Sequence, residues 1–168
     1  FLSWYFNNLK LGATFIRQQL NLPLIPADRL YTQFRFRGKE NINGGIDYSF
    51  NKGKTQLFGE AAISKSKGIA FVQGAIVNLN DQLSVSMLLR HFDKDYQSRW
   101  ANTFAEGSNI NNESGLYFGT KLLPVKFVTI SAYSDIYRSQ WLNYTTAAPS
   151  NGWDVMAQAN VVLSNKTE

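Results

Sequence analysis

The sequence predicts an all-β protein, an antiparallel up-and-down transmembrane β-barrel. Three observations lead to this prediction. Apolar and polar residues alternate, the alternating segments are about ten residues long, and the connections between them are by turns short and long. Alternation with a period of two indicates strands, because successive side chains of a strand point to opposite faces. A length of about 9–11 residues is what a tilted strand needs to cross a membrane.

The composition narrows the class of protein. The chain has 168 residues, which we assign to a single β-barrel domain, residues 1–168. It has no cysteine, so a disulfide framework and thiolate chemistry are excluded. It has no uninterrupted run of about 18 apolar residues, the length of a membrane-spanning helix. Its first residues resemble the end of a strand rather than a signal peptide, so we expect a segment of a larger barrel, lacking an amino-terminal region and further strands.

Nine segments of the chain alternate in this way. They cover residues 1–6, 10–19, 41–51, 54–64, 68–78, 82–92, 114–123, 126–137 and 152–163. Tight turns with Asn, Gly, Asp or Pro lie at 7–8, 51–54, 78–81 and 123–125. The connections at 20–40, 65–67, 93–113 and 138–151 fall at every second position, and three of these four are long. Short turns at one end and longer loops at the other are typical of outer-membrane barrels.

The two faces of the predicted strands differ in character. One face is mostly apolar, and the other carries polar residues and charges of both signs. Within 68–92 we place the Val, Ile, Leu and Met residues toward lipid, and we place Gln73, Ser84, Ser86 and Arg90 toward the lumen. Large aromatic residues gather near the strand ends, where their amphipathic rings suit a membrane–water boundary.

A soluble β-sandwich that acts as a binding module is the alternative fold, because alternation alone does not tell which face meets water. The sorting of connections by length favours the barrel. The net charge is +5, but the Lys and Arg residues are scattered through turns, whereas a nucleic-acid surface needs a contiguous basic patch. We therefore expect no nucleic acid to be bound by this region, and we interpret "FRFRGKE" as a loop-borne strand above the membrane.

The single histidine, His91, is the candidate for chemistry. Asp93 and Asp95 follow it, and membrane barrels can host hydrolases in which a histidine pairs with Asp or Ser at the outer rim. Against this, His91 shares a face with Met87 and Leu89, and no serine stands in a Gly-x-Ser-x-Gly elbow. One imidazole without thiolates is a poor metal site. We predict a non-enzymatic protein without catalytic residues, metal or cofactor, and keep a rim enzyme near His91 as the alternative.

The long loops 93–113 and 138–151 should lie together on the extracellular side. They hold residue types that are enriched in binding hot spots, and we predict a partner-binding surface there. Its residues are Tyr96, Arg99, Trp100, Phe104, Trp141 and Tyr144. The expected partners are outer-membrane lipid and other envelope proteins. In the alternative arrangement, these rings fold down over the barrel mouth or lie among the lipid headgroups.

Three stretches carry a resemblance to a known family: "DRLYTQFRFRGKENINGGIDYSF", "RHFDKDYQSRWANTFAEGSNINNESGLYFG" and "ISAYSDIYRSQWLNYTTAAPSNGWDVMAQA". Over most of residues 28–160 the chain resembles the carboxy-terminal β-barrel region of large Bacteroidota envelope proteins that carry amino-terminal helix-hairpin-helix repeats. The resemblance implies a bacterial outer-membrane location, with this chain covering only part of the barrel. A DNA-related role of the repeats does not extend to these residues. Together with the residue patterns, we predict a pore or a docking component of a cell-envelope complex.

Overall fold

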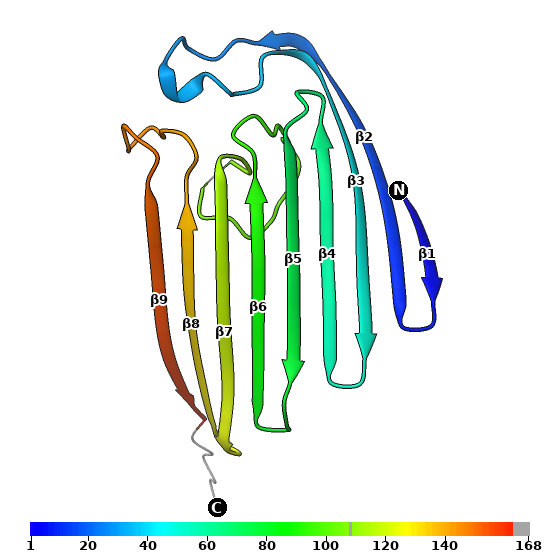
Figure 1. The fold of residues 1–168 in the computed structure, drawn as a ribbon, viewed down its shortest axis with the longest axis vertical. Coiled ribbons are helices and arrows are strands. Elements are labelled where there is room, and N and C mark those ends of the chain that lie inside the picture. Colours follow the sequence, from blue (N-terminus) through cyan, green and yellow to red (C-terminus); the bar gives the residue numbers. More distant parts are fainter. Residues whose placement is uncertain (108, 163–168) are drawn as a thin grey trace, which may run out of the picture.

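A computed structural model describes residues 1–107 and 109–162. Nine antiparallel strands form one sheet, in which each strand pairs with its neighbours along the chain (Figure 1). The strands are β1 (Leu2–Phe6), β2 (Leu9–Leu24), β3 (Gly38–Lys52), β4 (Thr55–Ser64), β5 (Ile69–Asn78), β6 (Leu83–Phe92), β7 (Glu113–Val125), β8 (Val128–Arg138) and β9 (Asn151–Val161). The predicted all-β, up-and-down fold is confirmed. Residue 163, the predicted end of the last strand, lies outside the described residues.

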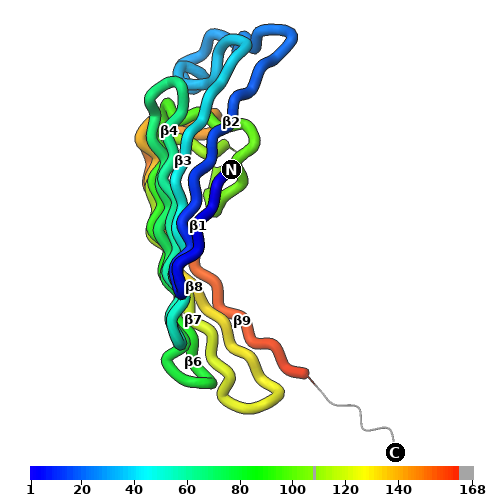
Figure 2. Tube along the Cα trace, turned by 90° about the vertical axis from the view of Figure 1, so that its right-hand side faces the viewer, coloured from blue at the N-terminus to red at the C-terminus, as the bar shows by residue number. Residues whose placement is uncertain are grey.

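The sheet is curved and open. β1 pairs only with β2 and β9 only with β8, so these two strands are its edges. Seen from the side, the connection between β6 and β7 lies on the concave side (Figure 2). The described residues form this one layer rather than two packed sheets. Their one helical segment is a 3₁₀ turn, η1 (Leu30–Thr32), and none of their helices is long and apolar enough to cross a membrane.

The two ends of the sheet carry different connections, as predicted. At one end lie the tight turns 7–8, 53–54, 79–82 and 126–127; at the other lie the connections 25–37, 65–68, 93–112 and 139–150. The backbone of Asn7 and Gly53 has positive φ angles of 44° and 57°, which the tight hairpin turns require and which Asn and Gly tolerate best.

The hairpin of β2 and β3 extends further than predicted. Residues 20–40 were expected to form a loop, but β2 continues to Leu24, where it pairs with Gly38 after a shift of register that begins at Gln19. In "LNLPL" a leucine recurs at every second position, which favours an extended backbone. Pro23 has no N–H to donate to the ladder, and it lies in the stretch where the regular pairing is interrupted.

The register gives the sheet two chemically different faces. The face that we call the polar face lies on the side of the 93–112 connection. It carries Lys10, Asp47, Glu60, Arg90, Glu113, Lys121, Asp135 and Asp154. The opposite face, the apolar face, carries Leu11, Ile46, Ile63, Met87, Leu89, Leu116, Phe118, Ile130, Ile136 and Val155.

The prediction for β5 was wrong in one respect. Gln73 pairs with Gly59 and Leu89 and lies on the apolar face, whereas Val72 lies opposite Arg90 on the polar face. Both faces of this strand are largely apolar, so alternation alone could not orient it, and the registers of its neighbours do.

The amide of Gln73 is satisfied locally on that apolar face. It accepts a hydrogen bond from Tyr48 at 2.6 Å, and it donates to the carbonyl of Phe58 at 3.0 Å. This removes most of the cost of a polar group in an apolar environment.

The sheet buries very little apolar surface by itself. The buried hydrophobic side chains are Ala70, Phe92 and Tyr96, which form one small cluster on the polar face. On the apolar face, large side chains stay exposed: 67% of Ile46, 52% of Phe118 and 59% of Ile136. The described residues therefore leave one complete face of the sheet without cover.

Candidate functional site on the polar face

The connection between β6 and β7, residues 93–112, folds inward onto the polar face, and we call it the inner loop. Its Tyr96 packs with Ala70 and Phe92 in the buried cluster. The carbonyl of Gln97 accepts hydrogen bonds from Asn41 at 2.7 Å and Asn43 at 2.9 Å. Asn41 and Asn43 belong to β3, which lies three strands away in the sheet, so the inner loop crosses the face rather than standing above it.

The path of the inner loop depends on a glycine in the neighbouring connection. A Cβ atom at Gly68 would lie 2.3 Å from the backbone nitrogen of Tyr96, so only glycine lets the two backbones come this close. Ser66 donates a hydrogen bond to the carbonyl of Asp95 at 2.6 Å in the same region. Burial raises the pKa of the Tyr96 hydroxyl, which agrees with its place in the cluster.

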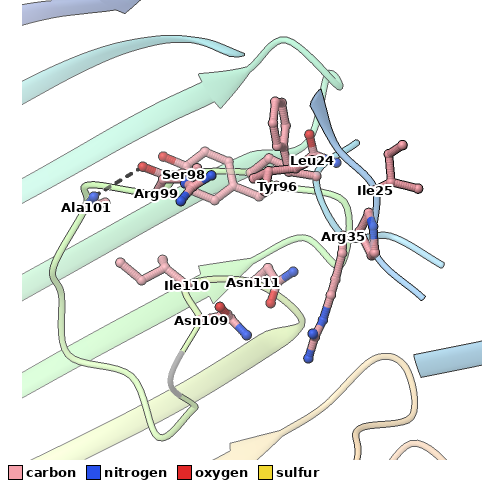
Figure 3. A pocket seen from close by; sticks show the side chains of 13 residues that line it. Leu24, Ile25, Arg35, Tyr96, Ser98, Arg99, Ala101, Asn109, Ile110 and Asn111 are labelled. Atoms are coloured by element: carbon pink, nitrogen blue, oxygen red, sulfur yellow. Dashed lines mark hydrogen bonds between the residues drawn. The ribbon is translucent and has the colours of Figure 1, made fainter. Parts of the chain in front are cut away.

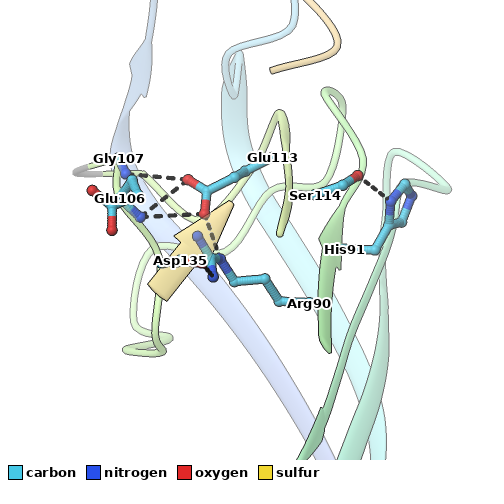
Figure 4. Close-up of polar contacts among 7 residues, drawn as sticks. All are labelled: Arg90, His91, Glu106, Gly107, Glu113, Ser114 and Asp135. Atoms are coloured by element: carbon cyan, nitrogen blue, oxygen red, sulfur yellow. Dashed lines mark hydrogen bonds and ion pairs between the residues drawn. The ribbon is translucent and has the colours of Figure 1, made fainter. Parts of the chain in front are cut away.

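A buried charge cluster lies beneath the inner loop (Figure 4). Arg90 Nε lies 2.6 Å from Glu113 Oε1, and its Nη1 lies 2.8 Å from Asp135 Oδ1. The three side chains are exposed by 0%, 8% and 1%. A Cβ at Gly115 would lie 2.4 Å from Arg90 Cζ, so glycine at this position makes the room for the guanidinium. Because the three come from β6, β7 and β8, the cluster joins three strands.

Glu113 also anchors the tip of the inner loop. Its carboxylate accepts hydrogen bonds from the backbone N–H of Glu106 at 3.1 Å and of Gly107 at 3.3 Å (Figure 4). The ring of Phe104 lies 5.3 Å from the guanidinium carbon of Arg90 and meets Tyr117 edge-on at 5.2 Å. One carboxylate thus holds both the buried arginine and the loop that covers it.

The surroundings of the cluster are rich in carboxylates. The charges of Asp135, Glu113 and Asp154 all act on Glu106, while Arg90 is the single cation of the cluster. Burial, followed by the charges of Asp135 and Glu113, raises the pKa of Glu106. Among the described residues no group of three or more His, Cys, Asp or Glu side chains is arranged to hold a metal ion. The arrangement is suited to fixing a loop.

The remaining long connections meet above the sheet. The connection 25–37 extends across the top of the sheet in Figure 1 and reaches the connection 139–150. Trp141 Nε1 donates a hydrogen bond to the carbonyl of Leu30 at 3.1 Å, and its ring meets Phe34 edge-on at 5.4 Å. Lys94 Nζ lies 4.5 Å from the centre of the Phe34 ring and 5.2 Å from the centre of the Trp141 ring.

The structure divides the six residues predicted to bind a partner. Tyr96 is buried and Phe104 covers Arg90, so these two rings face inward, as in the alternative arrangement. Trp141 takes part in the contacts of the upper connections, next to Tyr144, whose ring meets Tyr31 at 5.4 Å but stays 79% exposed. Arg99 and Trp100 are exposed, Trp100 by 76%. A partner-binding role for the exposed residues stays a prediction.

A cleft of about 520 Å³ opens between the inner loop and the connection 25–37 (Figure 3). Arg35 and Arg99 line it from the two sides, together with Asn109 and Asn111. Neither arginine has a carboxylate within ion-pairing distance in the described part of the chain. The cleft depends on how two connections distant in the sequence approach each other, so residue patterns alone do not predict it.

His91 lies on the apolar face, as predicted, at the end of the sheet that carries the long connections. Its Nδ1 lies 2.7 Å from Ser114 Oγ, and its Nε2 lies 3.1 Å from Asp93 Oδ1. Asp93 is two residues from His91 and was predicted beside it, whereas Ser114 is 23 residues away and was not predicted. Only the register between β6 and β7 places Ser114 directly opposite His91.

Comparison of the chain with known protein families, with curated proteins and with solved structures gives no match.

Proposed function

We propose that the chain forms nine strands in the wall of a β-barrel in a bacterial outer membrane, without enzymatic activity in its lumen. The polar face lines that lumen, which the inner loop narrows, and the barrel serves as a restricted pore. The observation that carries this proposal is the continuous, uncovered apolar face of a single-layer sheet. Soluble monomers rarely expose contiguous apolar patches above a few hundred Å².

The dimensions of the strands support the proposal. At about 3.4 Å per residue, a ten-residue strand is about 34 Å long, and a tilt of about 40° reduces its height to about 26 Å. This height matches the apolar band of outer-membrane barrels, which is about 25 Å tall. β4, β5 and β6 each have ten residues.

The ends of the apolar face support it as well. Exposed aromatic rings stand near both ends of the sheet: Phe6 and Phe127 at the turns, and Trp153 near the long connections. Such rings mark the two interfaces of a membrane. The sequence resemblance to the barrel region of Bacteroidota envelope proteins implies the same location.

The two edges set a requirement on the complete barrel. β1 and β9 each have one side of backbone groups without a strand partner in this sheet. Unpaired N–H and C=O groups cost several kcal/mol each in hydrocarbon, so within a membrane both edges need partners. Further strands that join β1 to β9 satisfy this requirement, and we include them in the proposal.

Reconstitution tests the proposal. The purified chain should require detergent, show a β-type circular dichroism spectrum, remain in liposomes after an alkaline wash, and migrate differently on gels with and without heating. A chain that stays monodisperse in buffer without detergent and does not enter liposomes contradicts the membrane proposal and favours a soluble β-protein.

Conductance separates a pore from a docking component. In planar bilayers the complete barrel should conduct ions weakly, and replacing residues 98–107 by a short Gly-Ser linker should raise the single-channel conductance. A membrane-inserted barrel that does not conduct in either form favours the second candidate, docking to other envelope proteins. The 79% exposure of Tyr144, on the connection 139–150, favours that second candidate.

A further inference from the structure

Three polar side chains stand in a row at the rim of the apolar face, on the side of the sheet opposite the inner loop. They are the hydroxyl of Ser114, the imidazole of His91 and the carboxylate of Asp93, joined by contacts of 2.7 Å and 3.1 Å. A nucleophile, a base that can take its proton and a group that orients the base are the parts of the triad of acyl-transfer hydrolases. Here the two ring nitrogens are exchanged relative to that triad, because Nδ1 faces the hydroxyl and Nε2 faces the carboxylate.

Each member of this row is held in place. Ser114 lies directly opposite His91 in the register of β6 and β7. The second carboxylate oxygen of Asp93 accepts a hydrogen bond from the backbone N–H of Ile69 at 2.9 Å. The ring of His91 stacks on Phe71 with 5.4 Å between ring centres. His91 and Asp93 are about one third exposed, so a substrate can reach them.

We assign the roles of the two ring nitrogens from the groups that they face. The carboxylate of Asp93 is an acceptor, so the Nε2 that faces it carries a proton. The neutral ring then has Nδ1 free to accept the proton of the Ser114 hydroxyl. This is the arrangement that a general base for Ser114 requires.

Arg138 completes the row. It lies directly opposite Ser114 in the register of β7 and β8, on the apolar face, and it is exposed. The described ion pairs do not include it. The backbone N–H groups of a central strand are used in the ladder, so we assign the stabilisation of an oxyanion to the guanidinium of Arg138, whose Cα pairs with that of Ser114.

We propose that Ser114, His91, Asp93 and Arg138 form a hydrolytic site for the acyl esters of membrane lipids. The lipid assignment rests on the proposed function, in which the apolar face meets the membrane. The site stands among exposed apolar side chains that an acyl chain can lie against: Ile69, Leu89, Leu116 and Ile136. Its place at the rim matches the depth of the ester bonds, which lie between the headgroups and the acyl chains.

The reaction balances without a cofactor or an oxidant. Ser114 Oγ attacks the ester carbonyl carbon while its proton passes to His91 Nδ1, and Arg138 faces the oxyanion that forms. The bond between the carbonyl carbon and the alcohol oxygen breaks, and His91 returns the proton to that oxygen. The acyl group is then bound to Ser114 as an acyl-serine. Water then attacks this acyl group with His91 again taking a proton, and the products are a fatty acid, the alcohol and free Ser114.

Two substrates and one probe test the proposal on the refolded full chain. The substrates are p-nitrophenyl butyrate, which dissolves in water, and dioleoyl phosphatidylcholine in mixed micelles; the probe is a fluorophosphonate that labels activated serines. We expect both substrates to be cleaved and the label to be found on Ser114. Ser114→Ala and His91→Ala should each lower kcat/KM by at least about 10³-fold.

The other variants separate direct from structural roles. Ser134→Ala, a serine on the same face outside the row, is the matched control and should keep full activity and labelling. Asp93 is a positioning residue, so Asp93→Asn should lower kcat with an unchanged KM and an unchanged circular dichroism spectrum. Arg138→Gln should lower kcat and leave labelling of Ser114 measurable.

Several outcomes overturn the proposal. A folded wild-type chain that neither cleaves the esters nor reacts with the probe overturns it, and so does activity that survives Ser114→Ala. Cleavage of the soluble ester alone overturns the lipid assignment. Failure of the proposed function is separate, because it shows as a lack of liposome insertion, whereas the hydrolysis of p-nitrophenyl butyrate does not require a membrane.

Discussion

The polar face and the apolar face belong to the same nine strands but differ in whether the chain itself covers them. On the polar face the chain supplies its own cover, because the inner loop lies over Arg90, Glu113 and Asp135 and reduces their exposure to 8% or less. On the apolar face it supplies none, and Phe118 stays 52% exposed. The stability of the sheet therefore depends on contacts with the inner loop on the polar face and, in our proposal, on contacts with lipid on the apolar face.

Removal of Arg90 should break the polar side most severely. Arg90→Met leaves Glu113 and Asp135 buried without a compensating cation, and we expect a loss of about 3–5 kcal/mol in the free energy of unfolding. Urea unfolding followed by the heat-dependent shift on gels measures it. The triple variant Arg90→Met, Glu113→Gln, Asp135→Asn should recover part of the loss; a single variant as stable as wild type contradicts the comparison.

A charge in the middle of the apolar face should have the next largest effect. In lipid, Phe118→Arg should cost about 2–4 kcal/mol, the range for a basic residue at the midplane of a bilayer. Gln158→Arg, which places the same charge on the polar face opposite Ser131, is the matched control and should change the free energy of unfolding by less than about 0.5 kcal/mol. Equal effects at the two positions would show that the apolar face does not meet lipid.

A methyl group at Gly115 should strain the charge cluster from below. Gly115→Ala places a Cβ 2.4 Å from Arg90 Cζ, and we expect a loss of about 1–3 kcal/mol in the free energy of unfolding. Gly44→Ala is the control, because nothing lies within 4 Å of the added Cβ at that position. Unfolding of both variants at the same urea concentration would show that the added methyl group does not disturb Arg90.

The smallest expected effect is the pH dependence that Glu106 contributes. Its folded-state pKa is raised, so the folded chain binds the proton more tightly than the unfolded chain. Stability therefore falls as the pH rises from the ordinary glutamate range through the raised pKa. Glu106→Gln should flatten this slope in urea midpoints measured from pH 4 to pH 7. A variant with the wild-type slope would show that another group titrates.

The strands were predictable and the approach of the loops was not. Alternation located the nine strands, because the period of two can be recognised in each strand without knowing which strands it pairs with. β5 shows the limit: with Phe71 and Val77 on one face and Val72 and Ile76 on the other, only the pairing partners orient Gln73. Alternation does not tell which side chains of a strand face lipid when both faces of the strand are apolar.

The candidate sites depended on register across long connections. Arg90 and Asp135 belong to predicted strands and Glu113 to the predicted loop 93–113, but their convergence needed the registers of β6 to β8. The same holds for Ser114, whose place opposite His91 follows from a pairing that crosses the 93–112 connection. The inward fold of that connection had one signal in the sequence: large aromatics such as Tyr96 and Phe104, which need cover.

The strictly sequential pairing of the strands has a consequence for how the chain acquires its structure. Each strand pairs with the strand that precedes it in the chain, so strands can be added in the order of synthesis. Most contacts therefore join residues that are close in the sequence. The hydrogen bond from Trp141 to Leu30 spans 111 residues and can form only after all the strands between them are aligned. This contact therefore reports the alignment of β3 to β8. Insertion or loss of one hairpin among them would keep the other registers but would change the distance that this contact must span.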